Sequence, residues 1–164
     1  VNAMTLAAQI LSAAAIRQGG KVRGAIYSSG APLVADWMRD ETTARDFFLN
    51  YSGGGTQFPF ALLRQWAEEA EGAIRVILSD RDFISNVDND AARGSLAYAT
   101  GRSAPLVAML MLGRGRGRSL LDRAGLATRD PAWRLVVVNA SKDFGRMAAQ
   151  LSAALFDVPA RHRR

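Results

Sequence analysis

The sequence predicts an α/β fold, in which helices cover both faces of a doubly wound, mostly parallel sheet. Three segments, at residues 73–79, 105–112 and 134–139, are apolar almost throughout, as parallel strands covered on both faces should be. Segments with apolar residues at helical spacing alternate with them, which favours right-handed crossover connections. Neither an internal repeat nor a linker interrupts the 164 residues. We therefore expect one domain over residues 1–158 and a basic tail over 159–164.

The first third of the chain predicts two helices and two strands. In order, these are a helix over 5–17, a strand over 21–28, an antiparallel strand returning along the sheet edge over 33–37, and a helix ending near residue 48. Gly19 and Gly20 end the first helix, because glycine adopts the left-handed conformation that closes a helix. Asp40 or Thr42 caps the second helix.

The remainder continues the alternation. Its predicted elements are a helix over about 59–70, a strand over 73–79, a polar loop over 80–89, a helix over 90–100, a strand over 105–112, a short helical piece over 120–124, a strand over 134–139 and a helix from Ser141 or Asp143 through Leu155. The strands at 21–28, 73–79, 105–112 and 134–139 are expected to share one sheet.

Composition excludes several kinds of chemistry. The chain has no cysteine, so disulfides, zinc–thiolate sites and cysteine nucleophiles are excluded. Its one histidine, His162, lies in the C-terminal tail, away from any predicted core site. No apolar run reaches membrane-spanning length. The expected location is the cytoplasm, without a membrane partner.

The net charge of +6 comes almost wholly from arginine. Arginines cluster at positions 114, 116 and 118 and again at 161, 163 and 164. Binding of nucleic acid or an acidic partner through these arginines is one reading. We favour ordinary solvated faces, because no aromatic residues alternate with the arginines as single-strand binding requires. The loop over 113–117 lacks the glycine and lysine spacing of phosphate-binding loops.

One glycine-rich loop and one strand end carry the candidate site. The loop Gly53-Gly54-Gly55-Thr56 delivers a threonine just before a helix, and the strand over 73–79 is followed by Asp80. Strand ends and helix starts meet at one edge of a parallel sheet. A hydroxyl and a carboxylate meeting there suit a hard divalent cation such as Mg²⁺. A second reading of Asp80 is a cap on the turn that follows it.

The loop after Asp80 is acidic. Asp82, Asp88 and Asp90 either form an outer coordination shell or simply solvate the loop, and we favour solvation. Arg81 either pairs with Asp82 or sits beside the site and weakens cation binding.

In this order of elements and motifs, the chain resembles the von Willebrand factor A domain family. The residues that carry the resemblance are Ile26-Tyr27-Ser28-Ser29, Gly54-Gly55-Thr56 and Leu78-Ser79-Asp80. The family has a Rossmann-like fold with a metal-ion-dependent adhesion site. The resemblance implies that Thr56 supplies a hydroxyl and Asp80 a carboxylate to Mg²⁺ or another divalent cation, directly or through water. Ser79-Asp80-Arg81 departs from the family's T-D-G.

The family's remaining ligands belong to a D-x-S-x-S motif on its first strand, and the printed sequence lacks that motif. Val1-Asn2-Ala3-Met4 reads as the residues just after it, so we expect the remaining ligands upstream of Val1. The family places that strand centrally, between the segments here at 21–28 and 73–79. The alternative is a start at Met4, with another element or chain filling the gap.

The resemblance implies a protein-interaction module without enzymatic activity. The bound cation would accept an aspartate or glutamate from a protein partner, and for bacterial family members that partner is often an AAA+ ATPase or a metal-insertion complex. Two alternatives remain: a metal-assisted hydrolase or phosphotransfer enzyme on the same frame, and the arginine-driven binding domain described above.

Overall fold

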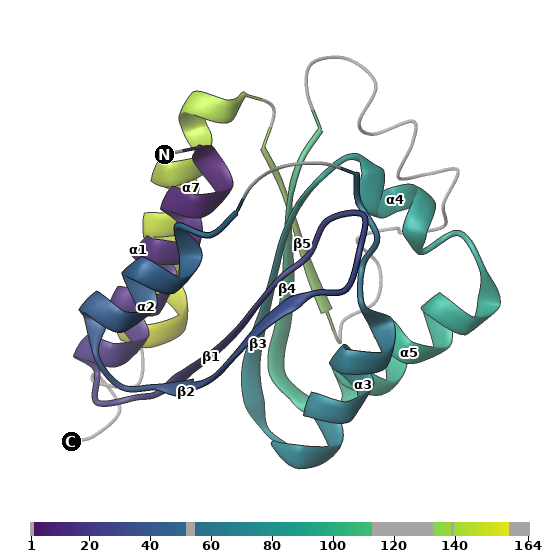
Figure 1. The fold of residues 1–164 in the computed structure, drawn as a ribbon, viewed down its shortest axis with the longest axis horizontal. Coiled ribbons are helices and arrows are strands. Elements are labelled where there is room, and N and C mark those ends of the chain that lie inside the picture. Colours follow the sequence, from purple (N-terminus) through teal and green to yellow (C-terminus); the bar gives the residue numbers. More distant parts are fainter. Residues whose placement is uncertain (1, 52–54, 113–132, 139, 158–164) are drawn as a thin grey trace. The chain divides into compact units, whose positions relative to one another are not determined.

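The computed structural model describes residues 2–51, 55–112, 133–138 and 140–157 (Figure 1). These residues belong to two units. The first, which we call the hairpin unit, joins the chain up to residue 54 with residues 141–164. The second, the parallel-sheet unit, spans residues 55–140. Each is described separately.

The hairpin unit contains two strands and a group of helices. Its elements are α1 (Ala3–Arg17), β1 (Val22–Ile26), β2 (Leu33–Met38), α2 (Glu41–Phe48), α7 (Ser141–Ser152) and the π-helix η1 (Ala153–Asp157). Helix α1 packs against both α2 and α7, and Figure 1 shows the three helices side by side. Gly145 of α7 faces Leu6 and Ile10 of α1, so the absence of a side chain there allows a close approach.

Both ends of α1 form as their residues predict. At the start, the side-chain oxygen of Asn2 accepts a hydrogen bond of 2.8 Å from the amide of Thr5. At the end, Gly19 adopts φ +85°. The amides of Gly19 and Gly20 then donate to the carbonyls of Ile16 and Ala15, at 2.9 and 3.0 Å. This is a Schellman motif, and it confirms that the glycine pair ends the helix.

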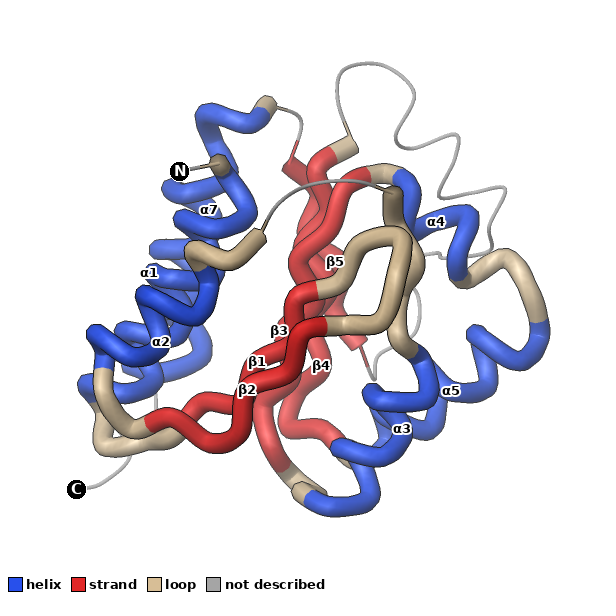
Figure 2. The backbone as a smooth tube through the Cα atoms, viewed as in Figure 1, coloured by secondary structure: helices blue, strands red, loops and turns tan. Residues whose placement is uncertain are grey.

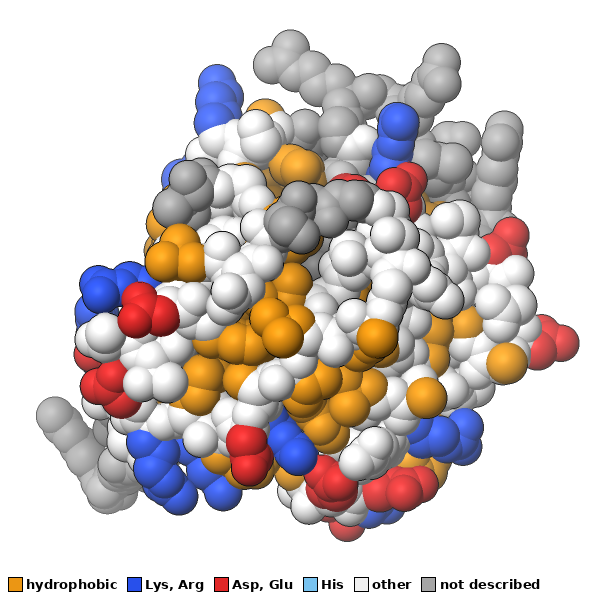
Figure 3. Space-filling model, viewed as in Figure 1, with side chains coloured by type: hydrophobic (Ala, Val, Ile, Leu, Met, Phe, Trp, Pro, Cys, Tyr) orange, Lys and Arg blue, Asp and Glu red, His pale blue; other side chains and the backbone are white. Residues whose placement is uncertain are grey.

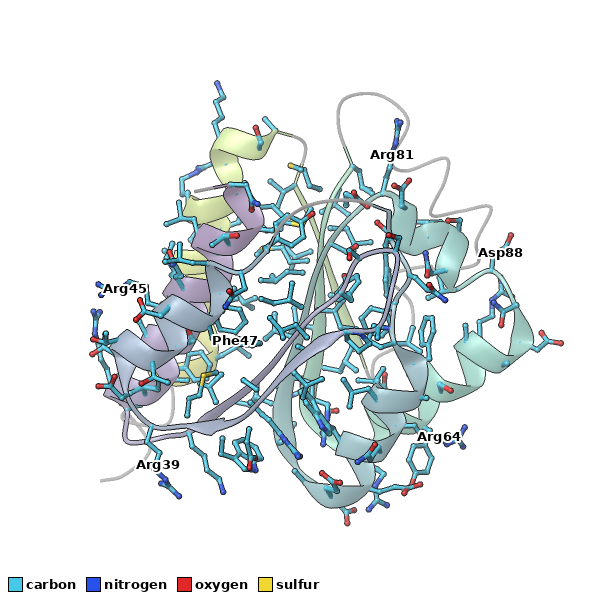
Figure 4. The ribbon with its side chains drawn as sticks, viewed as in Figure 1. Arg39, Arg45, Phe47, Arg64, Arg81 and Asp88 are labelled. Atoms are coloured by element: carbon cyan, nitrogen blue, oxygen red, sulfur yellow. The ribbon has the colours of Figure 1, made fainter. Side chains whose placement is uncertain are left out.

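Strands β1 and β2 form an antiparallel hairpin, as predicted for the returning segment. Asp40 caps the next helix, α2, by accepting from the amide and hydroxyl of Thr43 at 2.9 and 3.0 Å. These bonds lower the pKa of the Asp40 carboxyl. Gly24 of β1 lies directly against the aromatic pair of α2, where a Cβ atom would come within 2.8 Å of Phe47 and 3.0 Å of Phe48. Figure 4 shows Phe47 on α2.

Replacing Gly24 with valine should destabilise the protein by about 1–3 kcal/mol, because the new side chain overlaps two packed rings that must move. Thermal unfolding measures the change. Gly30→Ala is the matched control, since no atom lies within 4 Å of a Cβ added at Gly30. Equal melting temperatures for the two variants would contradict the close packing of β1 on α2.

The parallel-sheet unit alternates helices with strands. Its elements are α3 (Phe60–Glu69), β3 (Ala73–Asp80), α4 (Asp82–Asn86), α5 (Asp90–Gly101), β4 (Ser103–Met111) and β5 (Trp133–Val138). The three strands form a parallel sheet in the order β3-β4-β5, drawn in red in Figure 2. This arrangement confirms a mixed α/β architecture with a parallel sheet.

The core of this unit lies between the sheet and its helices. Phe83, Leu106 and Leu110 are fully buried there. Helices α3, α4 and α5 supply the other side of the core, and Figure 1 shows them along the same side of β3 and β4. The strand β4 is central in the sheet and buried from Leu106 to Leu110, which explains its uninterrupted apolar sequence.

Two sequence predictions are wrong. The four segments expected in one sheet are divided: β1 pairs with β2 in a separate two-stranded sheet, and only β3, β4 and β5 share the parallel sheet. No described strand joins β1 to β3. The stretch 80–89, predicted as a polar loop, contains the short helix α4, because Phe83, Ile84 and Val87 are buried against the sheet.

Some predictions fall on residues that the structure does not describe. They are the loop over 113–117, the helical piece over 120–124, the arginine cluster at 114–118 and the tail over 159–164. In the described part of the chain, no helix combines the length and the apolar character needed to cross a membrane.

Candidate functional site

The candidate site lies at the carboxyl end of β3. Asp80 is the last residue of that strand and pairs in register with Met111, the last residue of β4. Thr56 lies in the segment that leads into α3. The sheet edge where parallel strands end is the usual ligand-binding edge of α/β folds.

Thr56 and Asp80 are brought together, as the strand-end argument predicts. The Oγ1 hydroxyl of Thr56 donates to Oδ1 of Asp80 across 3.4 Å, and both residues are half-buried. That separation is long for a hydroxyl hydrogen bond, which is shortest and strongest at about 2.7–2.8 Å. Two oxygens bound at right angles to one cation would lie about 3.0 Å apart for Mg²⁺ and about 3.4 Å apart for Ca²⁺. A cation shared by the two side chains would have to replace this hydrogen bond or bind through Oδ2, the other oxygen of the Asp80 carboxylate.

Asp80 also performs the second role considered for it. Its Oδ1 atom accepts from the backbone amide of Asp82 at 2.9 Å, which ties the carboxylate to the first residue of α4. Both bonds therefore use the same oxygen. No described residue donates a hydrogen bond to Oδ2, so this atom carries the carboxylate's remaining capacity to bind a ligand.

Sequence reasoning missed Asn86, the last residue of α4. Its side-chain amide accepts from the amide of Phe58 at 2.9 Å and donates to the carbonyl of Thr56 at 3.1 Å. A second bond from the same nitrogen reaches the carbonyl of Asp82 at 2.9 Å. Asparagine in a polar segment is too common to be singled out, and its partners lie 28 and 30 positions earlier in the chain.

The other charged residues near Asp80 are arranged differently. Asp88 pairs with Arg93 at 3.3 Å and lies exposed on the loop between α4 and α5 (Figure 4), so it is not aimed at Asp80. Asp82 and Asp90 are the exposed first residues of α4 and α5, where acidic side chains favour the helix dipole. Arg81 is exposed and extends outward at the start of α4 (Figure 4).

The donor set at this edge is small. Among the described residues, no three aspartate, glutamate or histidine side chains come together in a position to hold a metal ion. What the edge provides is one carboxylate and one hydroxyl, both oxygen donors of the type that Mg²⁺ and Ca²⁺ prefer. Magnesium commonly keeps several waters in protein sites, so such a set is chemically suitable although incomplete for a closed site.

Basic and acidic side chains both appear on the face drawn in Figure 3. Several arginines have structural partners. Arg64 stacks 4.6 Å from the Tyr98 ring, and Arg102 pairs with Glu71 at 3.4 Å. This distribution agrees with solvated and structural roles for the described arginines.

Comparisons of the chain with family models, curated proteins and solved structures found no match.

Proposed function

We propose that the chain is a protein-interaction module that binds a divalent cation through Thr56 and Asp80 and, through that cation, an aspartate or glutamate of a partner protein. The observation that carries the proposal is the 3.4 Å approach of the Thr56 hydroxyl to the Asp80 carboxylate at the carboxyl end of β3. Two distant segments supply the two oxygens.

Each residue has a distinct task in the proposed site. Asp80 provides the negative charge that attracts the cation, and its bond from the Asp82 amide fixes the carboxylate plane. Thr56 provides a neutral oxygen. The bound cation then provides an open position for a carboxylate. Among the described residues, no group of three or more acidic or histidine side chains gathers at this pair, and we therefore favour binding over catalysis.

Asp80→Asn tests this function. The substitution keeps the oxygen that accepts from the Asp82 amide but removes the charge, so the turn into α4 should persist. We expect Mn²⁺ affinity, followed by electron paramagnetic resonance, to fall about tenfold or more. Asp88→Asn, in the same acidic segment, should leave the affinity unchanged because Asp88 faces Arg93. Equal Mn²⁺ binding by the wild type and Asp80→Asn would overturn the proposal.

A second measurement separates the cation-dependent mode from the arginine-driven one. Immobilised polyglutamate is the probe. Binding through the cation should disappear with chelator and with Asp80→Asn and should persist in moderate salt. Binding that survives both treatments but collapses as salt rises would instead assign the interaction to the arginines.

A further inference from the structure

Asn86 occupies a special position in the parallel-sheet unit. Its side chain uses one acceptor and two donors, and all three reach backbone groups. Two of these groups, the Thr56 carbonyl and the Phe58 amide, flank a single residue of the loop before α3. The side-chain amide of Asn86 thus bonds to the loop backbone as a neighbouring strand would. These bonds fix where the backbone of Thr56 lies.

The third bond of Asn86 connects the loop to the carboxylate. The carbonyl of Asp82 accepts from Asn86 at 2.9 Å, and the amide of the same Asp82 donates to Asp80 at 2.9 Å. Helix α4 therefore holds both halves of the candidate site: Asp80 through its first residue and Thr56 through its last. The helix is itself fixed in the core by Phe83 and Ile84, which are buried.

The loop is held from a second side by packing. The Phe58 ring meets the Phe83 ring edge-on, with 5.2 Å between their centroids. This contact holds the loop near the helix, but a ring contact does not specify where the Thr56 hydroxyl points. Two of the Asn86 bonds act on the backbone from which that hydroxyl projects, because they demand a definite orientation of the Thr56 carbonyl and the Phe58 amide.

We propose that Asn86 is a positioning residue that keeps the hydroxyl of Thr56 beside the carboxylate of Asp80 and so preorganises the site. This inference rests on the proposed function only for its metal-binding readout. The preorganisation itself is a property of the protein without a metal. Without it, the loop must be ordered when the cation binds, and affinity falls.

Three variants test the positioning role. Asn86→Leu removes all three bonds at similar volume. Asn86→Asp keeps an acceptor for the Phe58 amide but cannot donate to the Thr56 carbonyl. Ser85→Ala is the matched control: the Ser85 hydroxyl donates to the same Asp82 carbonyl, at 2.8 Å, and not to the loop that carries Thr56.

Two metal-free readouts decide the proposal. Amide hydrogen exchange at Phe58 should speed up about tenfold in Asn86→Leu and remain near the wild-type rate in Asn86→Asp and Ser85→Ala. Side-chain scalar couplings of Thr56 should report one rotamer in the wild type and Ser85→Ala, and an average in Asn86→Leu and Asn86→Asp. Unchanged couplings in both Asn86 variants would overturn the positioning role.

The metal-binding readout then separates this inference from the proposed function. In Asn86→Leu, Mn²⁺ affinity should fall about three- to tenfold, whereas Ser85→Ala should keep it. A wild-type protein that binds no Mn²⁺ refutes the proposed function and leaves the exchange and coupling results to decide the role of Asn86. If the wild type and Asn86→Leu bind Mn²⁺ with equal affinity, Asn86 does not preorganise the site.

Discussion

Replacing Arg75 with methionine should destabilise the parallel-sheet unit by about 2–4 kcal/mol, because a charged donor would be removed from several half-buried acceptors at once. The guanidinium Nη2 donates to the carbonyls of Trp66, at 2.9 Å, and Ala70. Both carbonyls lie at the end of α3, where the Trp66 carbonyl also accepts from the Ala70 amide at 2.9 Å. A cation there also interacts favourably with the negative end of the helix dipole.

The other nitrogen of Arg75 binds the turn between α5 and β4. Nη1 donates to the carbonyl of Arg102 and to the hydroxyl of Ser103, both at 3.0 Å. One side chain on β3 therefore joins the end of α3 to the start of β4. Burial, with a smaller effect of the Arg102 cation, lowers the pKa of Arg75 below its ordinary value. The charge is thus partly desolvated, and its hydrogen bonds offset that cost.

Urea unfolding, followed by circular dichroism, measures the loss. Arg64→Met is the matched control, because Arg64 is exposed and its stacking on Tyr98 contributes about 0.5–1 kcal/mol. Arg75→Lys should fall between the wild type and Arg75→Met, since a single ammonium cannot reach both sets of acceptors. If Arg75→Met and Arg64→Met unfold at the same urea concentration, the network around Arg75 does not stabilise the fold.

The elements that could be predicted are those whose sequence signal is local. The apolar run of β4 predicts a buried strand, and the glycine pair after α1 predicts a helix end. Each prediction needs only a few consecutive residues. The pairing of strands is different, because it is set by distant parts of the chain. Nothing within the segment 21–28 shows that it pairs with β2 alone and not with the parallel sheet.

Short elements and side-chain networks account for the other omissions. Helix α4 has only five residues, too few to show helical periodicity, and its buried Phe83 and Ile84 stand among polar neighbours. Arg75 appeared simply as the polar residue of an apolar strand. Its role depends on carbonyls from α3 and from the turn before β4, which folding alone brings together.

The candidate site shows the same division. Thr56 and Asp80 could be selected because strand ends and helix starts converge in parallel sheets, and the structure places them 3.4 Å apart. Asn86 could not be selected, because its importance comes from the backbone groups it binds. The sequence therefore indicates the candidate ligand residues of a site, but it gives little indication of the residues that orient them.

Replacing Phe83 with alanine should destabilise the parallel-sheet unit by about 3–5 kcal/mol, the usual cost of emptying a fully buried aromatic position. Phe83 has no exposed surface, and its ring lies 5.2 Å from that of Phe58 and 6.4 Å from that of Phe60. The cavity would therefore open between α4 and the segment that carries Thr56. Phe83→Leu fills most of the volume and should cost clearly less than Phe83→Ala.

The same pair of variants connects the core to the candidate site. Because Phe83 anchors α4, its truncation should loosen the bonds of Asn86 as well as the packing of Phe58. Amide exchange at Phe58 should therefore speed up more in Phe83→Ala than in Phe83→Leu, even under conditions where both proteins remain folded. A Phe83→Ala protein that is folded, strongly destabilised and yet unchanged in Phe58 exchange would show that the loop is held independently of the core. In that case Asn86 would have to hold Thr56 beside Asp80 even when helix α4, which carries Asn86, is no longer anchored in the core.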